Sequence, residues 1–330
     1  LWKELFYLNK MEYLMKRIII FLILFGSCDR GEKGIISEPR PVITEVITLE
    51  SDYINQVYYD LYTTSVVSSN VKFDWDIGFS CNALESRLIL NSSNGGAVCK
   101  FYNMNFNEEP ELNNVVWEWD TPNGNMDSTS FGNLDTNILY IIDRGYDLNG
   151  NNIGYKKIRL LEFDNLGYHL RIANLNNTED TLIYIVKNSN KQFVSFSFND
   201  YSIDLIEPEE TNWDLLFTQY TEIFTDPAMA YIVTGVLINQ NHVQVALDTI
   251  NAFNDINYSM INQYVFNSSR DYIGYQWKVF NFSSNLYTIR NDYNFIIKDD
   301  KDRYFKLHFI DFYNNMGEKG FPTFEIQELL

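Results

Sequence analysis

The sequence predicts an all-β protein built from two tandem antiparallel β units with few or no helices. Three observations point to this class. Aromatic residues make up 16% of the 330 residues, and such a composition favours strands over helices. Short apolar runs alternate with clusters of Asn, Gly, Asp and Ser, which is typical of many-stranded antiparallel proteins. In addition, the stretches 73–79 and 211–217 echo each other.

The first residues predict export and lipidation. A basic start at residues 15–17 precedes the apolar run 18–25, and Gly-Ser-Cys follows it. This eight-residue run is too short to cross a bilayer, which takes roughly 20 residues, but it matches a secretory signal. We predict that residues 1–28 are a signal peptide with a lipobox, that translation starts at Met15, and that Cys28 carries the lipid. An ordinary cleaved signal with Cys28 as a bystander is the alternative.

The remaining chain is predicted to be a tether followed by the two β units. Residues 29–45 are polar and contain two prolines and two glycines, as in a linker. The first unit is predicted at 46–180 and the second at 181–330. A lipid on Cys28 would hold the protein at the outer membrane, on the cell surface, although the sequence leaves open whether the anchor faces outward or inward.

The repeated stretches are predicted to be strands. Apolar side chains recur at every second position, so each set lines one strand face. The two sets are Trp75, Ile77, Phe79 and Trp213, Leu215, Phe217. The Asp after each Trp, Asp76 or Asp214, falls on the opposite face, where it can accept hydrogen bonds from a neighbouring loop. A catalytic role for either is less favoured, because no second carboxylate or His is placed beside it.

Turns and hairpins are predicted in both halves. The dipeptides at residues 94–95, 123–124 and 149–150 are Asn-Gly, which suits turns with positive φ. Hairpins are expected at 140–160 and again at 295–309. The strand-like segments 56–61 and 192–197 precede the two Trp-Asp stretches at nearly equal distances. A short helix is possible only within 252–265.

Two cysteines remain after Cys28. Cys81 and Cys99 could pair in an oxidising compartment, where a disulfide closing a loop of this length would stabilise the protein by about 3 kcal/mol. Two free buried thiols are the alternative. As zinc ligands they lack two partners at workable spacing, so we predict no metal site.

Several function classes are disfavoured. The net charge is −19, and an acidic surface repels DNA, RNA and anionic lipid head groups. We therefore expect no nucleic-acid partner and membrane contact through the lipid anchor only. The sequence has no Gly-x-Ser-x-Gly elbow, no P-loop and no His-Glu-x-x-His motif, so we do not expect an enzyme.

The chain resembles the HmuY family of Bacteroidetes surface lipoproteins. The resemblance is carried by the Trp-Asp strands and by the closing stretch, an aromatic-rich strand at 304–313 followed by a Gly-Glu-Lys-Gly turn and a Pro-Thr-Phe-Glu strand at 317–326. Residues 190–330 match well. The first copy keeps its Trp-Asp strand, but it has only Gly-Tyr-His-Leu at 167–170 where the closing strand is expected.

The resemblance implies haem capture at the cell surface and transfer to an outer-membrane haem receptor. In the family the iron is held by two axial side chains, His in the founding protein and Met in some relatives. The candidates here are His242, in a loop between two apolar runs, then Met229, and finally His308. For each of the three a structural role is favoured, because no His follows either Trp-Asp strand.

A second hypothesis keeps the surface lipoprotein but removes haem. The sequence holds only three His residues, which favours a protein that binds a glycan, a peptide or a partner protein. Trp117 and Trp119 could stack on a sugar, although residues spaced by two are more often part of a core.

Overall fold

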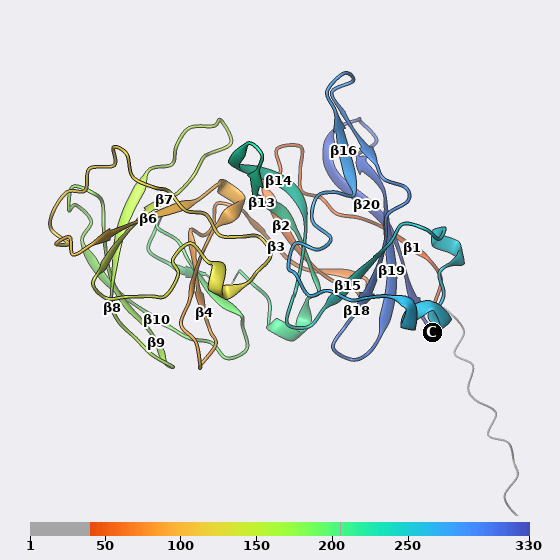
Figure 1. Cartoon of the computed structure of the whole chain (residues 1–330), viewed down its shortest axis with the longest axis horizontal. Coiled ribbons are helices and arrows are strands. Elements are labelled where there is room, and N and C mark those ends of the chain that lie inside the picture. Colours follow the sequence, from red (N-terminus) through yellow and green to blue (C-terminus); the bar gives the residue numbers. More distant parts are fainter. Residues whose placement is uncertain (1–39, 205) are drawn as a thin grey trace, which may run out of the picture. The chain divides into compact units, whose positions relative to one another are not determined.

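The computed structural model describes residues 40–204 and 206–330, so Cys28 and the predicted signal peptide lie outside the described residues. Regular structure in the described part consists of strands and short 3-10 helices (Figure 1), which confirms the all-β prediction. Within the same residues, no helix is long and apolar enough to span a bilayer. The described residues cluster as one compact unit.

Four larger sheets and one hairpin, all antiparallel, organise the strands. Sheet A has the order β1 (Ile43–Val46), β20 (Lys319–Leu329), β19 (Tyr304–Tyr313), β18 (Asn294–Lys298), β15 (Gln244–Asp248). Sheet B has the order β14 (Ala228–Ile238), β13 (Leu215–Thr225), β2 (Asn55–Asp60), β3 (Ser65–Val71). Sheet C has the order β12 (Ile203–Asp204), β11 (Phe193–Phe196), β4 (Ile77–Ser80), β5 (Leu88–Leu90). Sheet D has the order β10 (Thr181–Val186), β9 (Gly167–Ala173), β8 (Tyr155–Phe163), β7 (Ile138–Asp143), β6 (Ala97–Tyr102). The hairpin pairs β16 (Lys278–Asn281) with β17 (Leu286–Ile289).

The connections carry five single-turn or two-turn 3-10 helices in the described residues. They are η1 (Ser92–Asn94), η2 (Met126–Ser128), η3 (Glu210–Asn212), η4 (Phe253–Asp255) and η5 (Tyr258–Gln263). The segment 252–265, where a short helix was considered, holds the last two. The predicted hairpins are confirmed as β7–β8 and β18–β19. The three Asn-Gly turns have φ of +77°, +74° and +78° at their glycines, as predicted.

Two cores join the sheets in pairs. One core packs sheet A on sheet B, with Tyr59, Phe217 and Phe324 in mutual ring contact. The other packs sheet C on sheet D, with Phe79 against Tyr168 and Phe196. Apolar burial of this kind is the main favourable term in folding. The protein therefore contains two β-sandwiches, A/B and C/D.

The two sandwiches are not consecutive in the chain. Sandwich C/D is built from residues 77–204, whereas sandwich A/B combines β1–β3 with β13–β15 and β18–β20. Strands from both sides of the predicted boundary at residues 180–181 pair in sheets B and C, where β13 lies against β2 and β11 against β4. The boundary itself stays a prediction. The predicted tether at 29–45 reaches into β1, whose Ile43 pairs with Ile326 of β20.

The two Trp-Asp stretches make the same hydrogen bonds. The backbone N–H of Asp76 donates to Phe196 O, and that of Asp214 donates to Tyr59 O. Each carboxylate then accepts from the backbone N–H two residues further along that partner strand, Asp76 from Phe198 at 2.6 Å and Asp214 from Leu61 at 2.8 Å. The predicted role of both carboxylates as hydrogen-bond acceptors agrees with these contacts.

An asparagine completes each copy of this arrangement. The side-chain amide of Asn91 donates to Trp75 O at 2.7 Å, and that of Asn239 donates to Trp213 O at 2.9 Å. Their backbone N–H groups donate to the carbonyls of Asp76 and Asp214. Both asparagines directly follow an apolar strand, Leu-Ile-Leu or Val-Leu-Ile, and both are fully buried.

The prediction that each Trp shares a face with the next two apolar residues is wrong. The strands begin at Ile77 and Leu215, two residues after each Trp, so strand alternation does not yet hold at the Trp positions. Trp213 packs with Leu216 rather than with Leu215, and Trp75 lines a cavity instead of entering the C/D core.

Candidate ligand-binding site

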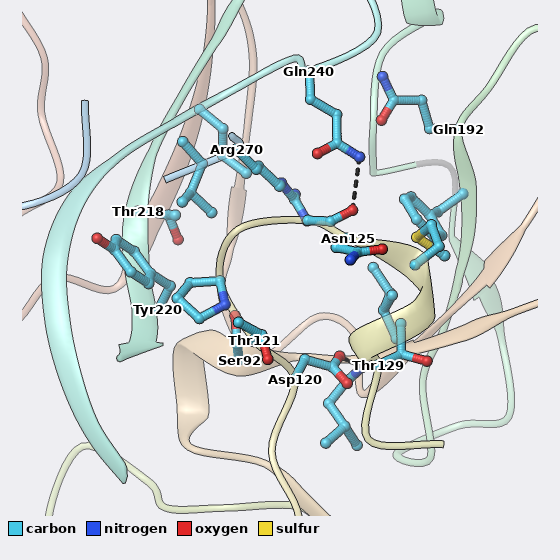
Figure 2. Close-up of a pocket in the computed structure, with 18 of the residues that line it drawn as sticks. Ser92, Asp120, Thr121, Asn125, Thr129, Gln192, Thr218, Tyr220, Gln240 and Arg270 are labelled. Carbon is cyan, nitrogen blue, oxygen red and sulfur yellow. Dashed lines mark hydrogen bonds between the residues drawn. The ribbon is translucent and has the colours of Figure 1, made fainter. Parts of the chain in front are cut away.

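A small cavity of about 60 Å³ lies where sheets B and C approach the loop of residues 120–129 (Figure 2). Its walls mix apolar and polar side chains. The apolar wall includes Trp75, Leu90, Phe193, Leu216 and Leu237. The polar groups include Asp120, Thr129, Gln192, Gln240 and Arg270. Strand exchange between the halves of the chain creates this meeting point, because β2 and β13 bring one wall and β5 and β11 bring the other.

Hydrogen bonds from Leu90, Ser130 and Gln240 hold the 120–129 loop in place. The carboxylate of Asp120 accepts from the backbone N–H of Leu90 at 2.6 Å and from the N–H and hydroxyl of Ser130 at 2.8 and 2.6 Å. The amide of Gln240 donates to Gly124 O at 2.8 Å, the dashed bond of Figure 2. A β-carbon at Gly124 would lie 2.1 Å from the oxygen of Gln240, so the loop approaches Gln240 closely only because this residue is glycine.

Arg270 brings a positive charge into the cavity. Its backbone is fixed, since its N–H donates to Asn123 O and its carbonyl accepts from Ile238. Its guanidinium lines the cavity (Figure 2) and makes no side-chain hydrogen bond or ion pair with any residue in 40–204 or 206–330. A partly enclosed guanidinium without a partner has five donors to offer.

The carboxyls of Asp120 and Glu207 interact electrostatically with the Arg270 charge. Burial raises the pKa of Asp120, and hydrogen bonds from Ser130 and Leu90, together with the charge of Arg270, act against that rise. Burial also raises the pKa of Glu207 to about 7, again opposed by Arg270. Neither carboxyl forms an ion pair with Arg270 in the described part of the chain.

Two hydroxyls beside the cavity have no hydrogen-bond partner within residues 40–204 and 206–330. The Oγ1 of Thr129 is buried and unpaired, and so is the hydroxyl of Tyr220. Tyr220 lines this cavity and also a second one. An unpaired buried hydroxyl destabilises a protein by roughly 1–3 kcal/mol, so such groups are expected where a ligand or an ordered water completes the site.

The arrangement suits a carboxylate. A guanidinium presents a planar pair of N–H donors that matches the two oxygens of a carboxylate, and the Thr129 hydroxyl can add a third donor. Sites for whole drug-sized ligands are roughly 300–1,000 Å³, whereas this cavity measures about 60 Å³. It therefore accommodates a head group, with the rest of any ligand outside.

The predicted haem ligands lie elsewhere. His242 is held between two carboxylates, with Nδ1 2.8 Å from Asp300 and Nε2 3.6 Å from Glu210. His308 contacts Glu325 through Nε2 at 2.9 Å and stacks on Phe253 with ring centroids 4.0 Å apart. Met229 is 47% exposed near the start of β14. None of the three lines the cavities described in this part of the chain.

Haem does not fit this set of residues. Two axial ligands would have to face one another across a flat apolar slot. Both histidines instead point a ring nitrogen at a carboxylate, and the three candidates share no cavity. No cluster of three or more His, Cys, Asp or Glu that could hold a metal ion occurs within the described residues.

The structure shows the two remaining cysteines as free buried thiols, the second of the two predicted alternatives. Cys81 and Cys99 are both free and buried. Cys81 belongs to the C/D core, whereas Cys99 packs on the other face of sheet D with Leu139 and Ile141. The disulfide is therefore not formed, because the sheet separates the two side chains.

The two tryptophans considered for sugar stacking are not equivalent. Trp117 packs against the cluster around Phe106 and stacks on Tyr155 at 5.8 Å between ring centroids, so one face of its ring is covered. Trp119 is half-buried and lies one residue before Asp120.

Sequence patterns identify almost none of the residues that line the cavity. Arg270, Asp120, Thr129 and Gln240 sit in polar loops without periodicity or a motif. The Asn-Gly turn at residues 123–124 was recognised as a turn, and it proves to be the part of the loop that Gln240 and Arg270 fasten.

Fold and site together define an all-β protein with a small cavity of mixed polar and apolar lining. The family model described as "HmuY protein" matches residues 52–207 and 202–326. The chain belongs to the HmuY family, which confirms the resemblance and the two tandem matches. No curated protein matches the sequence.

Three solved structures of bacterial proteins are similar to this chain. Apo PinO from Porphyromonas gingivitis is 11% identical, with 88% of this chain and 98% of that chain covered and a TM-score of 0.38. The apo HmuY analog of Tannerella forsythia is 10% identical, with 89% and 100% covered and a TM-score of 0.25. A Bacteroides vulgatus protein described as HmuY-like and haem-binding is 11% identical, with 86% and 90% covered and a TM-score of 0.23.

Proposed function

We propose that this chain is a lipid-anchored binding protein of the outer-membrane surface that captures a ligand by its carboxylate group. The lipid would be carried by Cys28, and the carboxylate would enter the cavity around Arg270. One observation carries the proposal. The Arg270 guanidinium lines a cavity yet has no hydrogen-bond or ion-pair partner in the described part of the chain.

Local charge outweighs the net charge of the protein at this cavity. The chain carries −19, which repels anions at long range, but salt screens exposed charges beyond about 8–10 Å. Inside a partly enclosed site the contact with a guanidinium is much stronger than in water. The raised pKa of Glu207, about 7, further reduces the opposing negative charge.

Binding of several small carboxylates tests the proposal. Trp75 lines the cavity, so its fluorescence should change on titration with acetate, with a free sialic acid and with a capped dipeptide that has a free C-terminus. The last two separate a glycan source from a peptide source. Arg270→Gln should weaken binding about tenfold or more, because a hydrogen bond to a charged group contributes about 1.5–3 kcal/mol.

A matched control removes the same charge elsewhere. Arg290 is exposed and lies over the ring of Tyr293, so Arg290→Gln should leave carboxylate binding unchanged. The proposal fails if none of the three carboxylates produces a saturable change, or if Arg270→Gln binds as well as the wild-type protein.

Haem remains the second candidate, favoured by membership of the HmuY family. Haem added to the purified protein would have to produce a shifted Soret band that disappears in a double His242→Ala, His308→Ala variant. A Soret shift that survives this double change would assign the axial contacts to other residues, and no shift at all would exclude haem.

Anchoring has its own test. Cys28→Ser should abolish incorporation of a labelled fatty acid and release the protein from the membrane fraction. Labelling that persists in this variant would rule out Cys28 as the lipid site.

A further inference from the structure

A second cavity, of about 260 Å³, shares Tyr220 with the first as a lining residue. It is formed by β13, by the loop of residues 271–276 and by the segment around Tyr293. The loop is held against β14, because Gly274 and Val236 exchange two backbone hydrogen bonds of 2.9 Å. The walls of this cavity therefore belong to fixed elements of sheet B and its neighbours.

The lining has a distinct chemistry. Four tyrosines line the cavity together with two carboxylates, and no Lys, Arg or His is among the lining residues. The tyrosines are Tyr220, Tyr272, Tyr275 and Tyr293, and the carboxylates are Glu222 and Asp271. Arg290 lies over the ring of Tyr293 with its guanidinium carbon 5.0 Å from the ring centroid, which shows that an aromatic face here already attracts a cation.

Neither carboxylate is neutralised by an ion pair within residues 40–204 and 206–330. Asp271 accepts one hydrogen bond, from the Ser269 hydroxyl at 2.5 Å. Burial and the charge of Asp271 raise the pKa of Glu222. Two neighbouring carboxylates without a counter-ion attract a cation.

The hydroxyl of Tyr220 is an independent pointer to a ligand. This side chain is only 1% exposed, and its hydroxyl has no hydrogen-bond partner among the described residues. The hydroxyl lies beside the second cavity, because a β-carbon at Gly274 would lie 3.2 Å from it, and Gly274 lines that cavity and not the first. The unpaired oxygen thus lies at the cavity that Glu222 and Asp271 also line.

We propose that this cavity binds an alkylammonium group. The two carboxylates supply charge, the Tyr220 hydroxyl accepts a hydrogen bond, and the tyrosine rings offer the electron-rich faces on which ammonium groups bind. A hard metal ion fits less well, since Ca²⁺ takes 6–8 oxygen ligands and the described residues hold no cluster of three acidic or metal-binding side chains. The acidic net charge of −19 would attract such a ligand at long range.

Calorimetric titration of the folded protein with pentylammonium, and with neutral pentanol as its matched probe, tests the proposal. Pentylammonium should bind saturably and pentanol should not. A capped tripeptide with lysine at its centre distinguishes a protein side chain from a free amine as the source of the ammonium group. This inference goes beyond capture of a carboxylate, because the two groups would occupy different cavities.

Two substitutions and one control locate the binding. Glu222→Gln and Tyr220→Phe should each weaken pentylammonium binding about tenfold, in line with hydrogen bonds to charged groups. Tyr220→Phe removes a hydroxyl that has no partner in the unliganded protein, so a merely structural role predicts no loss. Glu109→Gln changes the same charge at an exposed position that lines none of the cavities described, and it should have no effect. Absence of saturable binding, equal binding of pentanol, or unchanged affinity in both variants would overturn the proposal.

Discussion

The carboxylate of Asp214 accepts a hydrogen bond from the backbone N–H of Leu61, which lies 153 positions earlier in the chain, at 2.8 Å. The equivalent carboxylate, Asp76, accepts from Phe198, which lies 122 positions later, at 2.6 Å. In both cases the Asp that follows a Trp accepts a hydrogen bond from the residue just beyond the end of a strand. That strand lies on the other side of the predicted boundary at residues 180–181 in the sequence. Each contact lies within one sandwich, A/B for Asp214 and C/D for Asp76, and both follow the same local rule.

Removing these carboxylates should destabilise the protein unequally. Asp214→Ala leaves the Leu61 N–H without its acceptor, which should reduce the free energy of unfolding by about 1–3 kcal/mol. Asp76→Ala should have a larger effect, because it also leaves the guanidinium of Arg144, paired with Asp76 at 2.8 Å and mostly buried, without its partner. Urea denaturation measures both, and equal losses would contradict this ranking.

Gly124 is expected to be more sensitive than other turn glycines. Gly124→Ala meets both a φ of +74° and the Gln240 oxygen at 2.1 Å, whereas Gly150→Ala meets a φ of +78° with no atom within 4 Å. Gly150→Ala should thus lower stability by about 1–2 kcal/mol from backbone conformation alone. Gly124→Ala should lower it further and also weaken carboxylate binding at Arg270. If the two variants unfold at the same denaturant concentration, the close approach of Gln240 is not a constraint.

Glu207 should make the protein less stable as the pH rises. Burial raises its pKa to about 7 from 4.5, so the folded state keeps a proton that the unfolded chain releases between these values. The associated stability is present below the unfolded pKa and is lost as pH rises through the folded pKa. The loss should amount to about 1–3 kcal/mol. Compared with wild-type protein, Glu207→Gln should gain stability at about pH 8 relative to about pH 5, and Glu109→Gln, at an exposed position, should not.

Lys278 should act in the opposite direction. It is buried without a carboxylate partner among the described residues, its ammonium donates to Thr234 O, and burial lowers its pKa to about 7. The stability linked to this lysine is present above its unfolded pKa and is lost as pH falls through about 7. Lys278→Met should therefore stabilise the protein by about 1–3 kcal/mol more at about pH 6 than at about pH 9. A pH-independent difference in urea midpoint would show that Lys278 does not titrate in this range.

The strand content, the turns and the local repeats followed from the sequence. Alternation and Asn-Gly turns are short-range signals, which is why the hairpins β7–β8 and β18–β19 and the glycine conformations were predictable. The face on which each Trp lies was not predictable, because side chains alternate only within a strand and each strand begins two residues after the Trp. The buried Asn91 and Asn239 left a signal that could have been used, since each follows an apolar strand directly.

The candidate sites were less predictable than the fold. His242 and His308 drew attention as potential iron ligands by residue type, yet each is engaged by a carboxylate that the sequence places far away, Asp300 and Glu325. Arg270 and Tyr220 carried no local pattern. What makes each of them notable is the lack of a bonding partner in a closed space, a property that only packing creates.

By itself the sequence determined the β class, the family and the two repeated Trp-Asp stretches. Only the tertiary structure decided that β2 pairs with β13, that β11 pairs with β4, and that a cavity with an unpaired arginine forms where these pairs meet. The physical reason is the distance along the sequence over which each kind of interaction acts. A period of two residues is set by the backbone within one strand, whereas the choice between partner strands depends on burial contacts among residues that lie more than a hundred positions apart.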